Sequence, residues 1–389
     1  MRYTDVAIVG GGLAGSTIAA TLGRAGVSAI LIDPHKIYPP DLRCEKLGDG
    51  QIDILRKTGL ADCVERATTL DGHVWVSRFG YLVQKRASDQ HGVMYDTLVN
   101  TLRDEIPSSV EVIVDKANAV STSADRQTIV LASGEEISAR LIVLANGLNI
   151  GLRHTLGIER EVISACHSIT VGFDVAPLDR DAFEFPALTY YPERSSDRMA
   201  YLTLFPIGDV MRANLMVYRD MDDPWLRQMR HAPEAALHAL MPRLRRITGD
   251  IKVTGPVKIR PADLYVSHGH RQPGIVLVGD AFATSCPAAG TGSDKVFTDA
   301  AQLCNVHIPN WLATNGMGAD KIAAFYDDNV KTACDAWSTD KAYHLRALST
   351  DNSLRWRAGR WARFLVRLTQ GSLSQLRSGG SLQAKTASI

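Results

Sequence analysis

Three glycines and one acid near the start of the chain have the spacing needed to bind a pyrophosphate and a ribose. In a Gly-x-Gly-x-x-Gly turn, Gly10 permits the tight bend and Gly12 lets a pyrophosphate approach the backbone, while Gly15 lets the next helix lie close to the strand. Asp33 follows about twenty residues later, where a carboxylate accepts hydrogen bonds from ribose hydroxyls. The pattern predicts a dinucleotide-binding turn made of Gly10, Gly12, Leu13, Ala14 and Gly15, with Asp33 as the ribose acceptor.

The residues around this turn form the elements that must position it. Two apolar runs, residues 6–9 and 29–32, enclose the turn and a helical pattern that continues to about Arg24. The order is therefore strand, turn, helix and strand, and the helix N-terminus offers N–H groups and a partial positive charge to phosphates. An ordinary strand–turn–helix unit is the alternative interpretation, but it does not require the acid. The motif does not specify which dinucleotide is bound.

A second glycine-rich stretch lies about 270 residues further along the chain. An apolar strand, residues 275–278, ends in Gly279 and Asp280, and a loop from Pro287 to Gly292 leads into a helix that reaches about Leu303. Glycines in this loop let the backbone approach a flat ring, and the helix start stabilises negative charge. A domain that binds only NAD has no need for this second signature.

This second stretch resembles the Gly-Asp motif of FAD-dependent monooxygenases of the 4-hydroxybenzoate hydroxylase type. The resemblance covers roughly Thr4 to Leu303. It implies that the aspartate holds the ribityl chain of non-covalent FAD and that the Pro-x-x-Gly-x-Gly loop lies against the isoalloxazine ring. The positions that the resemblance assigns to FAD are Arg43, Asn146, Gly147, Gly279, Asp280, Pro287, Gly290, Thr291 and Gly292.

The chain departs from this family at two places. The family carries Asp-Gly after a strand and then a Ser and an Arg, whereas this chain has Asn146 before Gly147, and Ile150 before Arg153. Asparagine keeps one acceptor but loses the charge. In the family this segment serves both FAD and the nicotinamide donor, so the replacement bears on flavin reduction. The second departure is Tyr95, where the family often has an arginine.

The resemblance and the patterning together predict an α/β fold. A Rossmann-like FAD-binding domain is expected in three pieces, residues 1–70, 93–161 and 265–307. A β-rich substrate lobe is expected in residues 71–92 and 162–264, and a helical C-terminal cap with a loose tail in residues 308–389. Within these ranges, the expected helices are 50–57, 93–105 and 232–244, and the expected strands of the lobe are 168–175, 200–205 and 212–218, with a strand pair around Phe79-Gly80.

The reaction that the resemblance implies needs NADPH or NADH, FAD and O2. Reduced FAD adds O2 to give a C4a-hydroperoxide, whose distal oxygen hydroxylates or epoxidises an aromatic or lipophilic small molecule. His167 and Tyr201 are the catalytic candidates, because titration of His167 assists deprotonation of a phenol. The substrate-pocket candidates are Tyr190, Tyr191, Thr203, Phe205 and Met216, and core packing is the alternative role for each of them.

Other functions remain open at this point. The stretch from Tyr201 to Pro206 partly resembles geranylgeranyl reductases, so one alternative is an FAD-dependent reductase of isoprenoid double bonds, which needs no O2. A flavin-dependent halogenase and a non-catalytic flavin-binding protein are the less favoured alternatives. The identity of the substrate, the choice between NADH and NADPH, and the oligomeric state are not specified by the sequence.

The composition is that of an ordinary enzyme. The 389 residues are 45% hydrophobic and 22% charged with a net charge of +1, which gives no reason to expect nucleic acid as a partner. No apolar run approaches the roughly eighteen residues of a membrane span, and the first strand starts almost at Met1, so a cytoplasmic location is expected. The six cysteines are scattered, and the pair His268 and His270 is read as part of a surface loop, so no metal site is expected.

The last helix in the sequence has two interpretations. An apolar stripe recurs at spacings of three and four, and arginines occupy the opposite side. A cap whose stripe packs on the FAD-binding domain is favoured, and peripheral contact with an anionic membrane is the alternative. The stripe is Leu354, Ala358, Trp361, Leu365 and Leu368, and the arginines are Arg360, Arg363 and Arg367.

Overall fold

The computed structural model describes residues 2–362 and 364–366, and it divides into two compact units. The domain ranges expected from the sequence remain predictions of functional domains. The first unit contains Met1–Thr69, His91–His167 and Ala262–Ala342, and the second contains Leu70–Gln90, Ser168–Pro261 and the described residues from Tyr343 onward.

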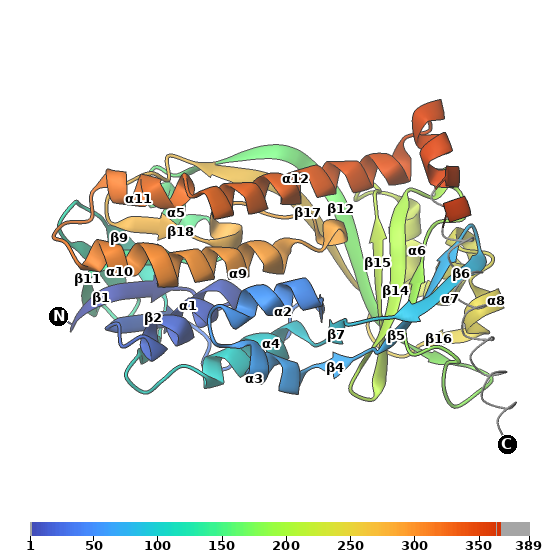
Figure 1. The fold of residues 1–389 in the computed structure, drawn as a ribbon, viewed down its shortest axis with the longest axis horizontal. Coiled ribbons are helices and arrows are strands. Elements are labelled where there is room, and N and C mark those ends of the chain that lie inside the picture. The colour runs from blue at the N-terminus through green and yellow to red at the C-terminus, as the bar shows by residue number, and fades with distance from the viewer. Residues whose placement is uncertain (1, 363, 367–389) are drawn as a thin grey trace, which may run out of the picture. The chain divides into compact units, whose positions relative to one another are not determined.

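The first unit is built on a mixed sheet (Figure 1). Among the described residues, this sheet has seven strands in the order β8-β2-β1-β11-β10-β9, with β18 paired to β11. The β1–β2, β1–β11, β2–β8 and β11–β18 pairs are parallel, which confirms the Rossmann-like α/β fold. The strands are β1 (Arg2–Val9), β2 (Ala29–Asp33), β8 (Glu111–Val114), β9 (Ala117–Ser121), β10 (Gln127–Leu131), β11 (Glu136–Leu144) and β18 (Ile275–Leu277).

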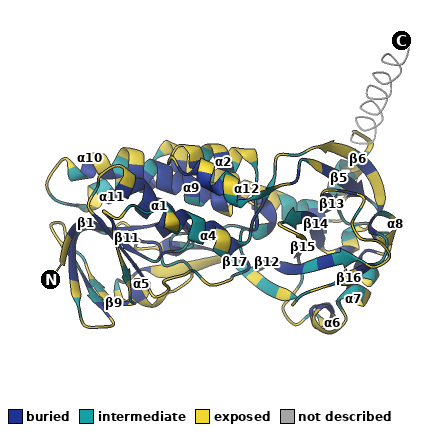
Figure 2. Ribbon diagram, turned by 90° about the horizontal axis from the view of Figure 1, so that it is seen from below, coloured by how far each residue is buried: buried dark blue, intermediate teal, exposed yellow. Residues whose placement is uncertain are grey.

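Apolar runs form the centre of this sheet because both of its faces are covered. Residues 6–9 of β1 pair with residues 141–144 of β11, and all eight side chains are buried, as the dark strands of Figure 2 show. Parallel strands covered on both sides read as continuous hydrophobic runs rather than alternating ones. Helix α1 (Leu13–Arg24) contributes Ile18 and Leu22 to the same core cluster.

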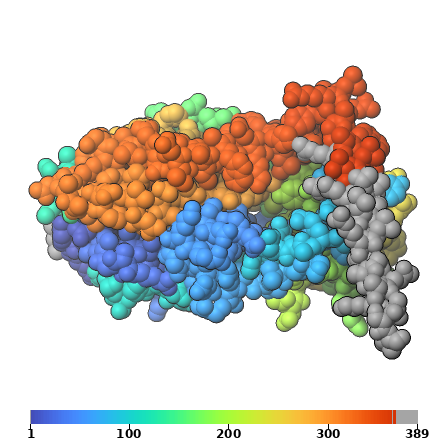
Figure 3. Space-filling view, in the orientation of Figure 1, coloured from blue at the N-terminus to red at the C-terminus, as the bar shows by residue number. Residues whose placement is uncertain are grey.

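Helices complete the first unit, and the expected helices 50–57 and 93–105 are confirmed as α2 and α4. Helix α9 packs against α2, and Figure 3 shows the orange residues that follow β18 beside blue residues from early in the chain. The elements are α2 (Asp49–Arg56), α3 (Ala61–Ala67), α4 (Tyr95–Asp104), α5 (Gly151–Thr155), α9 (Gly292–Gln302), a π-helical turn (Leu303–His307), α10 (Ile308–Leu312), α11 (Ala319–Tyr326), α12 (Asn329–Thr350), two 3-10 turns (Gly279–Ala281 and Pro287–Ala289), and the small sheet of β3 (Lys46–Leu47), β7 (His91–Gly92) and β4 (Thr69–Leu70).

A second sheet carries the expected alternating strands. In the described part of the chain, it has eight strands. Seven follow the order β16-β12-β15-β14-β13-β5-β6, and the eighth, β17, pairs with β12. The β5–β6 hairpin turns at Phe79 and Gly80, which both have positive φ, as the twist of a tight hairpin requires. The strands are β5 (His73–Arg78), β6 (Tyr81–Ala87), β12 (Glu159–Pro177), β13 (Leu188–Tyr190), β14 (Met199–Ile207), β15 (Val210–Val217), β16 (Ile251–Val253) and β17 (Lys258–His268), with a 3-10 turn at Ser195–Asp197.

The helix expected near residues 232–244 is confirmed as α7 (Pro233–Leu240), although it ends before the expected residue 244. The helix α6 (Pro224–His231) precedes it and α8 (Arg245–Thr248) follows it. Pro233 occupies the first turn of α7, where its missing N–H costs nothing, and Pro242 follows the end of that helix. Apolar periodicity alone did not show these two breaks.

The C-terminal helix differs from its favoured interpretation. Residues 354–362 and 364–366 are helical, but Leu354 is 80% exposed and Trp361 and Leu365 are more than half exposed. The stripe is therefore not packed as a cap. Arg360, which was expected on the opposite side from the stripe, donates hydrogen bonds to the carbonyls of Leu348 and Asp351. Arg363, Arg367 and Leu368, and the expected loose tail, lie outside the described residues.

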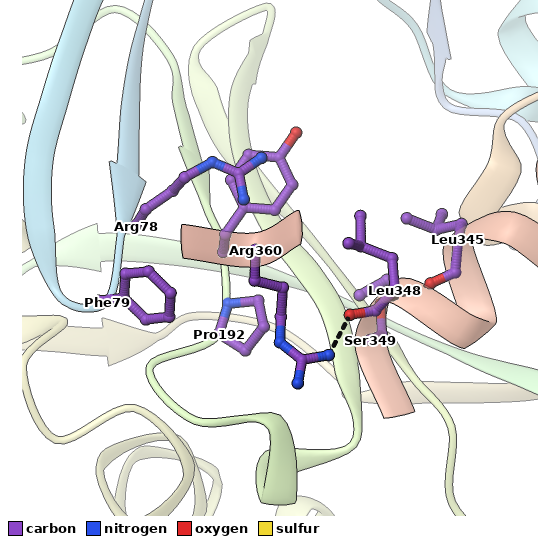
Figure 4. Close-up of a pocket in the computed structure, with 9 residues that line it drawn as sticks. Arg78, Phe79, Pro192, Leu345, Leu348, Ser349 and Arg360 are labelled. Carbon is purple, nitrogen blue, oxygen red and sulfur yellow. Dashed lines mark hydrogen bonds between the residues drawn. The ribbon is translucent and has the colours of Figure 1, made fainter. Parts of the chain in front are cut away.

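Near this helix, the second unit has a pocket lined by Arg78, Tyr191, Leu348 and Arg360, among others (Figure 4). Its volume of about 30 Å³ is sufficient for roughly one or two water molecules and not for an aromatic ring. Within the described residues, no helix has the length and apolar character needed to cross a membrane.

Candidate active site

The glycine turn at the start of α1 has the shape that a pyrophosphate needs. Gly10 has a φ of 103°, and a Cβ on it would lie 2.6 Å from the carbonyl oxygen of Ala145. A Cβ on Gly15 would lie 1.8 Å from the Gly10 carbonyl oxygen, so helix and strand meet closely. In contrast, the nearest atom to a Cβ on Gly12 is 3.8 Å away, in the ring of Tyr38. A Cβ on Gly12 would make only ordinary contacts with Tyr38 and Tyr95, so Gly12 is the least crowded of the three glycines.

Asp33 is held in place by several donors at the end of β2. Its carboxylate accepts hydrogen bonds from the N–H of Gly11 at 2.6 Å and of His35 at 2.9 Å. The guanidinium of Arg103 lies 3.0 Å from the same carboxylate and also donates to the Gly11 carbonyl at 2.6 Å. Arg103 was not predicted from the sequence, because a basic residue in the last turn of α4 carries no signal of a partner 70 residues earlier.

Arg43, from the segment that follows β2, holds Asp280 of the second glycine-rich stretch. Its Nη1 lies 2.7 Å from Oδ2 of Asp280, and its Nε donates to Asp41 at 2.6 Å. The guanidinium also lies 5.8 Å from the centre of the Tyr95 ring. Burial opposes the charge of Arg43, but Tyr95 and the two carboxylates raise its pKa overall. Burial also raises the pKa of Tyr95, against the effect of Arg43.

Buried Arg153 fixes the turn that carries Asp280. Its Nη1 donates to the carbonyl of Ala281 at 2.8 Å and its Nη2 to the carbonyl of Asn149 at 3.2 Å. The Asn146 amide donates to that same Asn149 carbonyl at 3.2 Å, whereas its Oδ1 is buried without a hydrogen-bond partner among the described residues. The structure therefore brings Asn146 and the Asp280 turn together through one arginine, and it leaves an acceptor oxygen available to a ligand.

The loop from Pro287 to Gly292 is held open by contacts from two other helices. Gly290 has a φ of 66°, and no atom lies within 4 Å of a Cβ placed on it. Gln51 of α2 donates to the Gly290 carbonyl at 2.9 Å, and Thr291 shares a 2.6 Å hydrogen bond with Ser338 of α12. Glycine at position 290 thus provides left-handed backbone and an open surface, which fits the approach of a flat ring.

A buried group of charges lies behind this loop. Lys331 of α12 is 1% exposed and contacts Asp299 at 2.9 Å and Asp335 at 3.1 Å, while Lys295 contacts Asp335 at 3.0 Å. The second carboxylate oxygen of Asp299 faces the N–H of Gly279 at 3.4 Å. Burial opposes the charge of Lys331, but the two carboxylates raise its pKa overall. The two lysines and two aspartates balance, so this interior carries no net charge.

The substrate candidates of the second unit do not all share one surface. Tyr201, Thr203 and Phe205 alternate along β14 and point to one side, on which Met216 lies opposite Tyr201. Tyr190 points to the other side, where its hydroxyl donates to Glu193 at 2.6 Å and burial raises its pKa. The structure therefore separates Tyr190 from the candidates on β14.

Two further candidates have contacts of their own. His167 belongs to the first unit, is fully buried, and has Nδ1 3.1 Å from the Ser164 hydroxyl. Tyr191 stacks under the Arg78 guanidinium at 3.9 Å. No group of three or more His, Cys, Asp or Glu side chains that could hold a metal ion is found among the residues that the structure describes.

The residues of the first unit fit FAD, because it contains the uncrowded Gly12, the open space over Gly290, the paired Asp280 carboxylate and the Asn146 oxygen. The sequence profile of the family described as "FAD binding domain" matches residues 3–311, which is most of the chain. The chain belongs to this family. FAD is its cofactor.

Curated relatives of this family member are hydroxylases and epoxidases. The chain is 27% identical over 340 residues to 3-demethoxyubiquinol 3-hydroxylase of Escherichia coli (strain K12), covering 78% of this chain and 79% of that protein. It is 23% identical over 335 residues to squalene epoxidase erg1 of Schizosaccharomyces pombe, covering 79% and 69%. The protein is an FAD-dependent oxidoreductase of the monooxygenase type, which hydroxylates or epoxidises a small molecule with O2.

Solved structures confirm the fold. Aklavinone-11 hydroxylase, solved with FAD and aklavinone, superposes with a TM-score of 0.71 at 19% identity, covering 90% of this chain and 70% of that one. The similarity of fold extends over both units of the chain, including the β-rich second unit.

Proposed function

We propose that this monooxygenase uses NADPH or NADH to reduce its FAD and oxidises an aromatic or lipophilic small molecule. The observation that carries the proposal is the closeness of the two glycine-rich stretches, because a Cβ on Gly279 would lie 3.5 Å from the Cβ of Ala14. Arg43, from the segment after β2, pairs with the neighbouring Asp280. The relatives named for a quinol and for squalene support a substrate that is largely apolar.

We propose the following roles in FAD binding. The pyrophosphate lies beside Gly12 at the N-terminus of α1, whose first turn holds Leu13 and Ala14 and whose partial positive charge favours an anion. Asp33 accepts from the adenosine ribose. Asp280, held by Arg43, accepts from the ribityl chain. The remaining positions line the bound cofactor, with Pro287, Gly290, Thr291 and Gly292 against the ring and Asn146, Gly147 and Gly279 beside it.

The protein's own part in the reaction is to bind, orient and exclude water. When bound, FAD takes a hydride from the nicotinamide and activates O2, and this chemistry belongs to the cofactor. The N-terminus of α9 places free N–H groups beside Gly292 and buried Ser293, where they stabilise negative charge on the adjacent ring edge. Gln51 and Ser338 hold this loop from two sides, so the ring meets a preorganised surface.

On the substrate side, we propose that Tyr191, Tyr201, Thr203, Phe205 and Met216 contact the substrate. His167 stays the candidate base for a phenol, and Tyr190 packs on the other side of the sheet. We also place the reaction in the cytoplasm. Peripheral membrane contact stays a prediction for the C-terminal helix, whose apolar stripe is exposed at Leu354 and Trp361. Sedimentation with anionic liposomes at low and moderate salt tests it.

Anaerobic reduction followed by oxygen tests the proposal. The purified protein should be yellow, its flavin should bleach with NADPH or NADH, and admission of ¹⁸O2 should give a product that carries one ¹⁸O atom. A substrate that gains two hydrogens in the absence of O2 would instead show the reductase of isoprenoid double bonds. Flavin that no nicotinamide reduces would contradict both activities.

A further inference from the structure

One side of the second sheet carries polar side chains at its centre. Asn214 of β15 lies opposite Gly172 of β12 and opposite Thr203 of β14. In the next row, Met216 lies opposite both Thr170 and Tyr201. Cross-strand partners in an antiparallel sheet project to the same side. We call the surface made by these six residues the Asn214 face.

The two sides of this sheet differ in character. The other side consists of apolar residues such as Val171, Leu202 and Leu215, which are at most 1% exposed. On the Asn214 face, Tyr201 is only partly buried, and so is Thr189, the β13 residue opposite Thr203. The apolar side is therefore a core, whereas the Asn214 face has polar groups and access from its edge.

The hydrogen bonds on this face leave one acceptor without a donor. Thr203 donates to the backbone carbonyl of Asn214 at 3.4 Å, and Thr170 donates to the sulfur of Met216 at 3.3 Å. Both hydroxyl donors are thus committed. Asn214 is only 6% exposed, and its Oδ1 atom is buried without a hydrogen-bond partner among the described residues. A buried acceptor of this kind carries a desolvation cost that a ligand's donor removes.

Two arginines lie near this face. Arg212, in the adjacent row, lies 3.0 Å from the Asp174 carboxylate, so the pair brings no net charge. Arg78 of β5 lies over the Tyr191 ring, which packs against the Tyr201 ring with their centres 6.1 Å apart. A carboxylate placed against Oδ1 of Asn214 would meet a second acceptor and leave that oxygen unpaired.

We propose that Asn214 determines specificity by accepting a hydrogen bond from a neutral aromatic substrate, through its phenolic O–H or an equivalent N–H. This inference rests on the proposed function, and it narrows the substrate class to neutral donors, with carboxylated rings disfavoured. Tyr201 and Met216, in the next row of the face, offer apolar contacts to the ring that carries the donor.

Three ring-matched probes test the inference on the FAD-loaded protein: 4-butylphenol, its methyl ether and 4-butylbenzoate. By calorimetry, the wild type should bind the phenol about tenfold more tightly than either of the others, as expected for one hydrogen bond. In Asn214→Leu, the preference for the phenol over the ether should disappear. The melting temperature should not fall, because the substitution removes an unpaired buried oxygen.

Ser77→Ala is the matched control, because Ser77 also has an unpartnered buried oxygen but belongs to the Tyr190 side of the sheet. It should keep the phenol preference. A wild type that binds the benzoate or the ether as tightly as the phenol, or that binds none of the three, overturns the inference, as does an Asn214→Leu protein that keeps the preference. FAD content and O2-dependent NAD(P)H oxidation of the same preparations test the proposed function separately.

Discussion

The cofactor segments of the first unit and the Asn214 face of the second unit recognise ligands in opposite ways. In the first unit the charged groups are paired before any ligand arrives: Arg43 with Asp280, Arg103 with Asp33, and Lys331 with Asp299. On the Asn214 face, the central group is neutral and its acceptor oxygen is unpaired.

This difference follows from the ligands. A dinucleotide carries fixed negative charges, so backbone N–H groups, glycines and a few ion pairs at set spacings suffice to bind it. A neutral substrate offers only shape and single hydrogen bonds, and many residue types satisfy these. The first kind of site therefore has a signature in the sequence, whereas the second depends on which side chains the strand register places together.

The largest effect is expected from a substitution that breaks the buried pair of Lys331 and Asp299 in the first unit. Lys331→Met leaves buried Asp299 without its lysine and partly buried Asp335 with Lys295 alone, so it should lower the free energy of unfolding by about 3–5 kcal/mol. Denaturant unfolding measures the loss. Lys341→Met, an exposed lysine on the same helix, should change it little. Unchanged stability of Lys331→Met would show that the buried charges are not coupled.

The second prediction concerns Asp280 itself. Asp280→Ala removes a charged acceptor and one of the two carboxylates on Arg43, so FAD binding should weaken by about 1.5–3 kcal/mol. Flavin fluorescence during titration of the apoprotein measures this, and Asp280→Asn should lose less because it keeps an acceptor. Asp53→Ala, which removes an exposed partner of Arg56, is the control. Wild-type FAD affinity in the Ala variant would show that Asp280 does not contact the cofactor.

A smaller effect is expected at Asn146, the neutral residue within the charged unit. Asn146→Asp restores the acid that the family usually has and should change the rate of flavin reduction by NADH or NADPH more than it changes FAD content. Stopped-flow absorbance of the flavin measures the rate. The same rate in both proteins, with either donor, would place the nicotinamide site elsewhere.

The smallest effect is a pH dependence at Cys44, near the start of α9. Burial raises the pKa of this thiol from 9.0 to about 11, although its contact with Ser293 opposes the shift. The folded state keeps the proton after the unfolded chain has lost it, so stability should fall as the pH rises from about 9 to 11. Alkylation of Cys44 by iodoacetamide, followed by mass spectrometry, should be slow at pH 8 compared with free cysteine. Equal rates at pH 8 would contradict the raised pKa.

The parts of the cofactor site that depend on short segments of the chain were predictable from the sequence. A positive φ at Gly10 or Gly290 and an acid at the end of a strand are properties of short segments. Three contacting residues were missed because each acts on a turn that lies 47 to 239 residues away along the chain. These residues are Gln51, Arg103 and Ser338. Neither composition nor spacing encodes such a contact.

The second unit shows a different limit. The alternation of residues along β14 places Tyr201 and Thr203 on one side of the sheet. The position of Asn214 opposite Thr203 could not be predicted, because it depends on the register between β14 and β15. The C-terminal stripe was correctly predicted to be helical, but its predicted packing was wrong for Leu354 and Trp361, which are exposed. Periodicity defines a face of a helix and does not say which partner covers it.

The position of Lys331 and Ser338 in α12 has a consequence for how this protein is made. The ribosome completes the Gly10 turn early but reaches Lys331 about 300 residues later, which at 5–20 residues per second takes roughly 15–60 s. Until then Asp299 has no lysine from α12, and Thr291 has no partner from Ser338. We therefore expect FAD to be captured only near the end of translation, and ribosome-bound chains that stop before α12 should not retain the flavin.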